Sequence, residues 1–283
     1  MFVNGYSEMK RFIPALAMKG EPTQFDDALS VAQDDLVTEI IGEDLEARLE
    51  QRNEQDKRLL NICQRIVSVQ AFLSTLHEMD LVLTDAGFGV VSNESVAPAS
   101  KERIQNLKLS LQIRLDENKD RLVNTLMKSE LYEDWRGTEE FARLSDGLIL
   151  TFADFKDVAV LNSITKDAYP QTWSDFLKLN AALNVAFTSD VASYISPDYA
   201  DEILEKIRDC ETFLPNELKV IKQIKTAIAA IALGDRDTGI TLAIKAAIFM
   251  KAHPEDFPTF MDSSTARADL TLTHSDTPLF YMF

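Results

Sequence analysis

Histidine and cysteine, the side chains that most often bind zinc, are rare in this 283-residue chain. The three histidines, His77, His253 and His274, are widely separated, and the two cysteines, Cys63 and Cys210, lie far from each other. Zinc sites that are recognisable from sequence place their cysteine and histidine ligands a few residues apart, and no such spacing occurs. Both cysteines fall in amphipathic helical patterns. We therefore expect them to be buried as small hydrophobic residues, not paired in a disulfide or bound to a metal.

Adjacent acidic residues are the remaining candidates for acid–base or metal chemistry. They are Asp34 with Asp35 and Glu43 with Asp44, and Asp134 follows further along the chain. The chain has 46 acidic and 29 basic residues, and neighbouring acids in so acidic a chain are usually solvated. Phosphate-binding glycine loops, G-x-S-x-G and H-E-x-x-H are absent. We predict no enzyme, no cofactor and no metal, although a site assembled from distant residues leaves no such motif.

Charge is distributed unevenly along the chain. The formal net charge is −17, which argues against nucleic-acid binding through ordinary phosphate contacts. Residues 21–56 carry a balance of −10, whereas residues 101–128 carry +3. These segments are either solvated helix faces or the complementary ends of a polarised molecule that stacks on a partner or on copies of itself. No run of 18 uncharged apolar residues occurs, so we predict no membrane association.

Apolar residues recur at helical spacing through most of the chain, which predicts a mainly α fold, a helical bundle. Ser100 and Thr138 are placed to cap helices, and Ser196 followed by Pro197 is typical of a helix start. Trp135 falls in a stretch that we expect to connect two helices. The predicted helices cover residues 25–40, 59–76, 100–126, 138–148, 173–191, 217–233 and 235–251, with further helices starting at residues 44 and 197.

A loose internal repeat relates two segments that lie 154 positions apart. Each copy consists of a helix, a short break and a second helix, with the breaks at residues 41–45 and 195–199. Chance similarity is the alternative to a duplication, and two copies are too few for a solenoid. We predict two halves: residues 1–150, with a β-hairpin and a long helix, and residues 151–283, with a β-like C-terminal tail. The matching residues are Ala28, Leu29, Ala32, Ile40, Ile41 and Asp44 in the first copy and Ala182, Leu183, Ala186, Tyr194, Ile195 and Asp198 in the second.

Two segments change from helical to strand-like periodicity. Residues 81–91 form two short apolar runs around Asp85-Ala-Gly87, which predicts a β-hairpin. The tail, residues 270–283, has a similar pattern and an apolar end, which either folds against its own subunit or adds to a neighbour's sheet edge. These segments supply the candidate subunit and partner contacts. They are Leu83, Phe88, Val90, Leu279, Phe280, Tyr281 and Phe283.

Several segments, taken in order, are similar to those of a known group of proteins. The segments are Ile41-Gly-Glu-Asp-Leu45, the helix from Leu59 to Leu76, the hairpin Val82–Val91, the link Val96–Ser100, the long helix to Asn124, and Trp135 before Thr138-Glu-Glu-Phe141. This order resembles a family of uncharacterised proteins from the structural-gene clusters of Bacteroidetes phages and prophages, whose relatives in crAss-like phages look like head-to-tail connector proteins (rings or adaptors). The resemblance is clearest over residues 25–145, and it assigns no functional role to any single residue.

The resemblance implies a structural protein of the virion. Its function would be that of a subunit in the head-to-tail connector, in a portal-proximal adaptor ring. The sequence does not separate this role from that of a tail-side ring or stopper. The ring implied is a dodecamer that contacts the portal protein and other tail or ring proteins, with DNA only as cargo in the channel. A helical assembly or regulatory protein that never enters the particle is the alternative from another functional class.

Overall fold

A computed structural model describes residues 1–13, 25–76, 81–84, 87–90, 100–159 and 169–268. The fold is mainly α, as predicted. Its chain divides into two compact units. Unit 1 comprises residues 1–144, 151–153 and 172–174, and unit 2 comprises residues 145–150, 154–171 and 175–283. The predicted boundary at residue 150 falls within the stretch where segments of the two units alternate.

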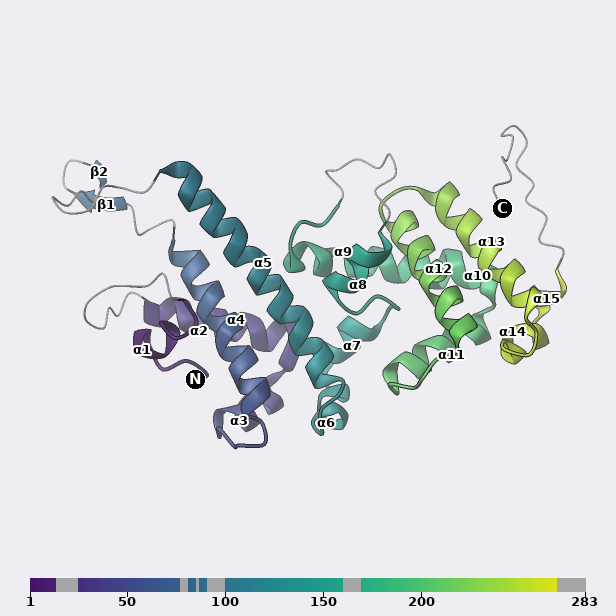
Figure 1. Ribbon diagram of the computed structural model, residues 1–283, viewed down its shortest axis with the longest axis horizontal. Coiled ribbons are helices and arrows are strands. Elements are labelled where there is room, and N and C mark those ends of the chain that lie inside the picture. The colour runs from purple at the N-terminus through teal and green to yellow at the C-terminus, as the bar shows by residue number, and fades with distance from the viewer. Residues whose placement is uncertain (14–24, 77–80, 85–86, 91–99, 160–168, 269–283) are drawn as a thin grey trace. The chain divides into compact units, whose positions relative to one another are not determined.

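Unit 1 is built around the long helix α4, which packs against α2 and against α5 (Figure 1). The apolar side of α4 is buried because its branched and aromatic residues recur every three or four positions, from Leu59 to Phe72. Ser100 caps α5 as predicted, since its side chain accepts a hydrogen bond from the Arg103 backbone N–H. The elements that begin in unit 1 are α1 (Tyr6–Met9), α2 (Asp26–Leu36), the π-helical segment η2 (Val37–Ile41), α3 (Glu43–Glu50), α4 (Lys57–Thr75), β1 (Leu81–Thr84), β2 (Gly87–Val90), α5 (Lys101–Leu126), α6 (Tyr132–Arg136), α7 (Glu139–Ser145), α8 (Phe152–Val158) and α9 (Trp173–Val185).

Unit 2 is organised around helices α12 and α13, which follow each other closely in sequence and pack against each other (Figure 1). Gly239 on α13 permits a close approach, because a Cβ there would lie 2.7 Å from the Ala227 carbonyl oxygen of α12. Aromatic residues fill the core near α14, where the Tyr199 ring meets the Phe257 ring edge-on at 5.8 Å. The remaining elements are η4 (Ala186–Val191), α10 (Ala192–Ile195), α11 (Pro197–Arg208), α12 (Pro215–Ala232), α13 (Arg236–Ala252), α14 (Pro258–Asp262) and α15 (Ser264–Arg267).

The two segments of the predicted repeat have the same local structure. In each, an α-helix runs into a π-helical segment, and the helical run ends at a residue with positive φ, after which a new helix starts at once. In the second segment the four residues of α10 lie between the π-helical segment and that residue. The positive-φ residues are Gly42 (φ 76°, ψ 163°) and Ser196 (φ 73°, ψ 142°), which lie 154 positions apart. Ser196 caps the next helix by accepting a hydrogen bond from the Tyr199 N–H. The two segments thus share an unusual backbone conformation in addition to their apolar pattern.

Side chains from later helices satisfy carbonyl groups in the π-helical segment η2. A π-helical turn shifts backbone hydrogen bonds away from the usual α-helical ladder and so leaves carbonyl groups available. The Trp135 indole N–H donates to the Ile40 carbonyl oxygen at 2.6 Å, and the Arg143 guanidinium donates to that of Thr38. Trp135 lies in helix α6, so its predicted place in a connecting stretch is wrong. Its burial against Phe141, at a ring distance of 4.9 Å, explains why this short helix is stable.

Two buried carboxylates on α5 bind the first turns of helices α8 and α9. Asp120 accepts hydrogen bonds from the backbone N–H groups of Phe152 at 2.9 Å and Ala153 at 3.0 Å. Asp116, one turn earlier, accepts from the Trp173 N–H at 3.2 Å. The first N–H groups of a helix have no partner within the helix, and they lie at the positive end of its dipole. These acids therefore stabilise unit 1 and are not available for chemistry.

The short strands β1 and β2 pair antiparallel over the residues where the sequence predicts a hairpin. In this register Leu83 lies opposite Phe88, and Leu81 lies opposite Val90. The second predicted hairpin, residues 270–283, lies outside the described residues.

Candidate functional site

The predicted contact residues fall into two groups. Leu83, Phe88 and Val90 lie on the paired strands β1 and β2, where Leu83 and Phe88 occupy directly facing positions. The other four, Leu279, Phe280, Tyr281 and Phe283, lie outside the described residues, as do His77 and His274.

The two cysteines differ in their surroundings. Cys63 is fully buried in α4, as predicted, and burial raises the pKa of its thiol to about 12. Cys210 is exposed, with φ of 53°, two residues beyond the end of α11. The prediction that Cys210 is buried is wrong, because the apolar periodicity of α11 ends before it is reached. Within the described part of the chain, no three His, Cys, Asp or Glu side chains group as metal ligands.

The acidic residues named from the sequence have structural partners or face solvent. Asp35 on α2 accepts a hydrogen bond from Gln70 at 2.6 Å, and Asp134 accepts one from Arg48 at 3.3 Å. Glu43 and Asp44 are exposed in the first turn of α3, where acids favour the helix dipole. His253 ends α13 and stacks on Phe249, so its position is that of a helix-terminal residue.

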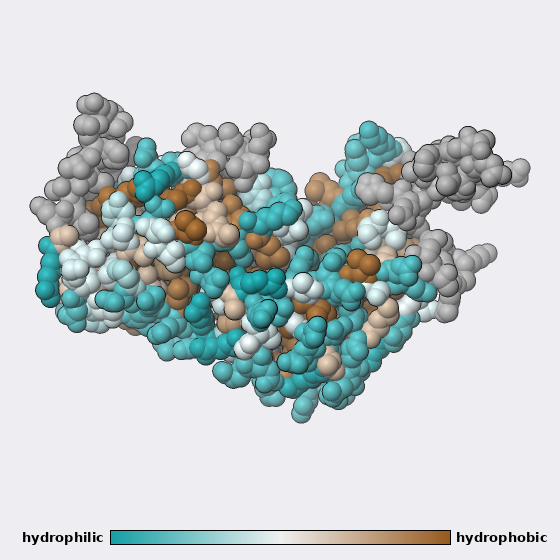
Figure 2. Space-filling model, turned by 180° about the vertical axis from the view of Figure 1, so that it is seen from behind, coloured by the Kyte–Doolittle hydropathy of each residue, from teal (hydrophilic) through white to brown (hydrophobic). Residues whose placement is uncertain are grey.

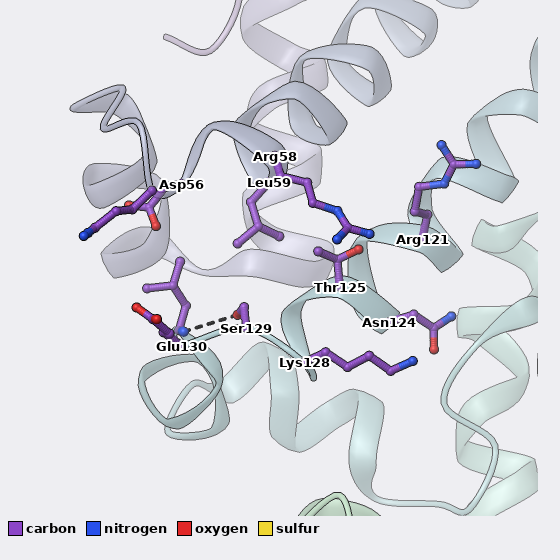
Figure 3. A pocket seen from close by; sticks show the side chains of 11 residues that line it. Asp56, Arg58, Leu59, Arg121, Asn124, Thr125, Lys128, Ser129 and Glu130 are labelled. Carbon is purple, nitrogen blue, oxygen red and sulfur yellow. Dashed lines mark hydrogen bonds between the residues drawn. The ribbon is translucent and has the colours of Figure 1, made fainter.

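A cavity of about 550 Å³ opens in unit 1 where the start of α4 meets the end of α5 (Figure 3). Helix α4 contributes Arg58 and Leu59, and α5 contributes Arg121, Asn124 and Thr125. The walls are completed by Lys128 to Leu131, which connect α5 to α6, and by Gln55 and Asp56 before α4. Because these two helices pack side by side in opposite chain directions, residues about 65 positions apart in sequence line one cavity.

Three cationic side chains line this cavity. Arg58, Arg121 and Lys128 are all exposed, and none of them forms an ion pair with another described residue. Figure 3 shows the Arg58 guanidinium directed toward Thr125, with Arg121, Asn124 and Lys128 on the same side of the cavity.

Acids in the cavity wall do not neutralise these cations. Asp56 is buried and accepts a hydrogen bond from the Arg48 Nε at 3.2 Å, so its charge is already compensated. Glu130 is exposed and lies with Asp56 on the other side of the cavity from Arg121 (Figure 3). The N-cap residue of α4 is Asp56, but the first turn that follows it carries Lys57 and Arg58 and no acid, and cations are unfavourable at the positive end of a helix dipole.

This cavity could not be predicted from the sequence, because its residues come from segments that are far apart in the chain. One local signal was present, since Arg121 and Lys128 are seven residues apart and seven residues are close to two helical turns. Arg58 gives no such signal, because only the packing of α4 against α5 brings it to the same place.

Residues 14–144 match DUF6712, a family of unknown function. The matched segment is slightly less than half of the chain, and it contains every residue that lines the cavity. No curated protein matches the chain, and no solved structure matches it either. Among the described helices, none is both long and apolar enough to cross a membrane.

Proposed function

We propose that this protein is a structural subunit of the head-to-tail connector of a tailed phage, a portal-proximal adaptor ring through which DNA passes. The proposal rests on the sequence resemblance over residues 25–145, which is nearly the segment that matches DUF6712. It assigns the protein no reaction and no cofactor. Its place would be in the virion, after assembly in the host cytoplasm.

The structural observation that best supports a ring is a pair of separate, different surfaces in unit 1. On α5, Leu109 is 62% exposed and Ile113, one turn later, is 49% exposed. On α2, Val31 is 58% exposed between the exposed acids Asp27 and Asp34. Helices α2 and α5 each pack on α4, so these two surfaces lie on different helices of unit 1.

Charge makes the two surfaces complementary. Between residues 101 and 114, the exposed charged residues of α5 are the bases Lys101, Arg103 and Arg114 and one acid, Glu102, whereas the exposed charged residues of α2 are all acids. An interface between two different patches joins copies head to tail, and such contacts close into a ring when the rotation between copies permits it. Hydrophobic residues also reach the surface in patches among hydrophilic ones on the face seen in Figure 2.

The strands β1 and β2 and the tail residues 270–283 are the other proposed contact elements. Strand addition to a neighbour's sheet edge gives contacts that are strong and specific in register. Under this proposal Leu83, Phe88 and Val90, together with the tail residues named above, contact neighbouring copies or the portal protein. The excess of acid suits a channel wall, because it repels phosphate and lets DNA slide.

Mass photometry of the full-length protein, alone and mixed with its portal protein, tests the ring. We expect oligomers for the unmodified chain and a shift toward monomers for Leu109→Asp, because a charge would be buried at the interface. Val185→Asp is the matched control, since Val185 is 59% exposed on α9 in unit 2. A protein that stays monomeric under both conditions, or equal effects of the two substitutions, would contradict the proposed interface.

Two other assignments give different outcomes. A tail-side ring or stopper would also oligomerise but would bind tail proteins and not the portal. A helical assembly or regulatory protein would be missing from purified particles.

A further inference from the structure

We propose that the cavity between the start of α4 and the end of α5 is a binding site for a phosphate group, with Arg58, Arg121 and Lys128 as its ligands. The inference does not depend on ring assembly, because all three residues belong to a single chain and to unit 1.

Arg58, Arg121 and Lys128 have no acidic partner among the described residues. Acids outnumber bases by 17 in this chain, and several cations of unit 1 form ion pairs with acids, such as Arg52 with Glu8 at 2.9 Å. Like charges that are brought together repel each other and lower the stability of the folded protein. Three cations around one cavity, none paired with a described acid, are an arrangement that a bound anion would stabilise.

The types of side chain favour phosphate. Guanidinium groups present several N–H donors in a planar fork that matches phosphate oxygens in pairs, and lysine adds a compact charge. The Arg58 guanidinium is directed toward Thr125 (Figure 3), whose hydroxyl adds a donor to the lining of the cavity. Asn124 also lines the site, and one of its amide hydrogens is already bound to the Asp120 carbonyl at 2.9 Å. A doubly charged tetrahedral anion would use these donors better than a single planar carboxylate.

The size of the cavity indicates that the ligand is larger than one phosphate ion. A volume of about 550 Å³ lies within the usual range for small-molecule sites. A phosphate group in it has two possible sources: a free polyphosphate or nucleotide, or the backbone of a nucleic acid. With a net charge of −17, the chain as a whole repels DNA, so backbone binding would be confined to this place.

Isothermal titration calorimetry of the full-length protein with sodium tripolyphosphate tests the site. The double substitution Arg58→Gln with Arg121→Gln should weaken binding at least tenfold. The control is Lys222→Gln with Lys245→Gln, exposed residues of α12 and α13 in unit 2, which changes the net charge equally and should alter the dissociation constant by less than twofold. Circular dichroism melting of both variants shows whether each is folded.

Two further titrations identify the source and the chemistry of the ligand. If the site binds a nucleic-acid backbone, a short DNA duplex will bind and tripolyphosphate will compete with it. The variant with Arg58→Gln and Arg121→Gln will then bind neither the duplex nor tripolyphosphate. If the ligand is a free polyanion, tripolyphosphate will bind and the duplex will not. Citrate at equal concentration should bind at least tenfold more weakly. The proposal is overturned if unmodified protein binds no tripolyphosphate, if citrate binds equally well, or if both double variants lose affinity alike.

Discussion

Gly42 and Ser196 occupy equivalent positions in the two repeat segments, and they should respond in opposite ways to substitution. Both have φ near 75° with an extended ψ, a combination that is open to glycine and strained for other residues. Gly42→Ala introduces this strain, and the new Cβ would lie 2.8 Å from a carboxylate oxygen of Glu140. Ser196→Gly removes strain that the protein already contains. The two changes therefore test one conformation from both sides.

Magnitudes follow from the strain of this conformation, which is about 1–3 kcal/mol for a residue other than glycine. Gly42→Ala should lower the free energy of unfolding by about 2 kcal/mol, since the end of the Glu140 side chain can move aside. For Ser196→Gly, the relief is offset by about 0.5–1 kcal/mol of glycine backbone entropy. Replacing a capping residue with glycine also costs a few tenths of a kcal/mol of stability, here through loss of the hydrogen bond that the Tyr199 N–H donates to Ser196. The net result should be stabilisation of about 0.5–1 kcal/mol.

Urea unfolding followed by far-ultraviolet circular dichroism measures both changes. Tryptophan fluorescence adds a signal from unit 1, because both Trp135 and Trp173 belong to it. Gly42→Ala should move the fluorescence midpoint to lower urea concentration, and Ser196→Gly should move a dichroism midpoint to higher concentration. A neutral Gly42→Ala, or a loss of more than about 1 kcal/mol on Ser196→Gly, would show that the two positions are not strained as described.

Three further predictions concern buried or paired groups. Asp120→Ala should destabilise the protein by about 2–4 kcal/mol in urea unfolding, because one buried and one half-buried N–H group lose a charged acceptor. An effect below about 1 kcal/mol would contradict the capping role. Ellman's reagent should label Cys210 alone in native protein and Cys63 only after unfolding, so rapid native labelling of two thiols would contradict the burial of Cys63. The hydrogen bond from Arg52 lowers the pKa of Glu8, so this ion pair stabilises the fold at pH values above the ordinary glutamate pKa, and the stabilisation is lost as the pH falls through the lowered pKa. Glu8→Gln should therefore make the urea midpoint less dependent on pH in the acid range. An unchanged pH dependence would contradict the role of this pair.

Local signals in the sequence predicted much of the helical structure. Ser100 and Ser196 are capping residues, and capping depends on a few neighbouring backbone groups, so it can be recognised from sequence. The apolar stripe of α5 predicted a helix to residue 126, and the structure has it. The long periodic segment of α4 was equally clear, because its buried face recurs over many turns.

Two of the three features that were predicted wrongly or missed, Trp135 and the cationic cavity, depend on packing between distant segments. Trp135 looked like a linker residue because α6 is only five residues long and is stabilised by contacts with Ile40 and Phe141. Cys210 continued an apolar pattern but lies past the end of α11. The cationic cavity requires α4 and α5 to meet, so Arg58 could not be placed beside Arg121 from their positions in the sequence.

Quantitative mass spectrometry of purified particles, from the phage or induced prophage that encodes this chain, tests the proposed function most directly. The proposal predicts that the protein is present in the virion at about one copy per portal subunit, as expected of a ring that stacks on the portal. Its absence from particles that contain portal and tail proteins in normal amounts would contradict a connector role.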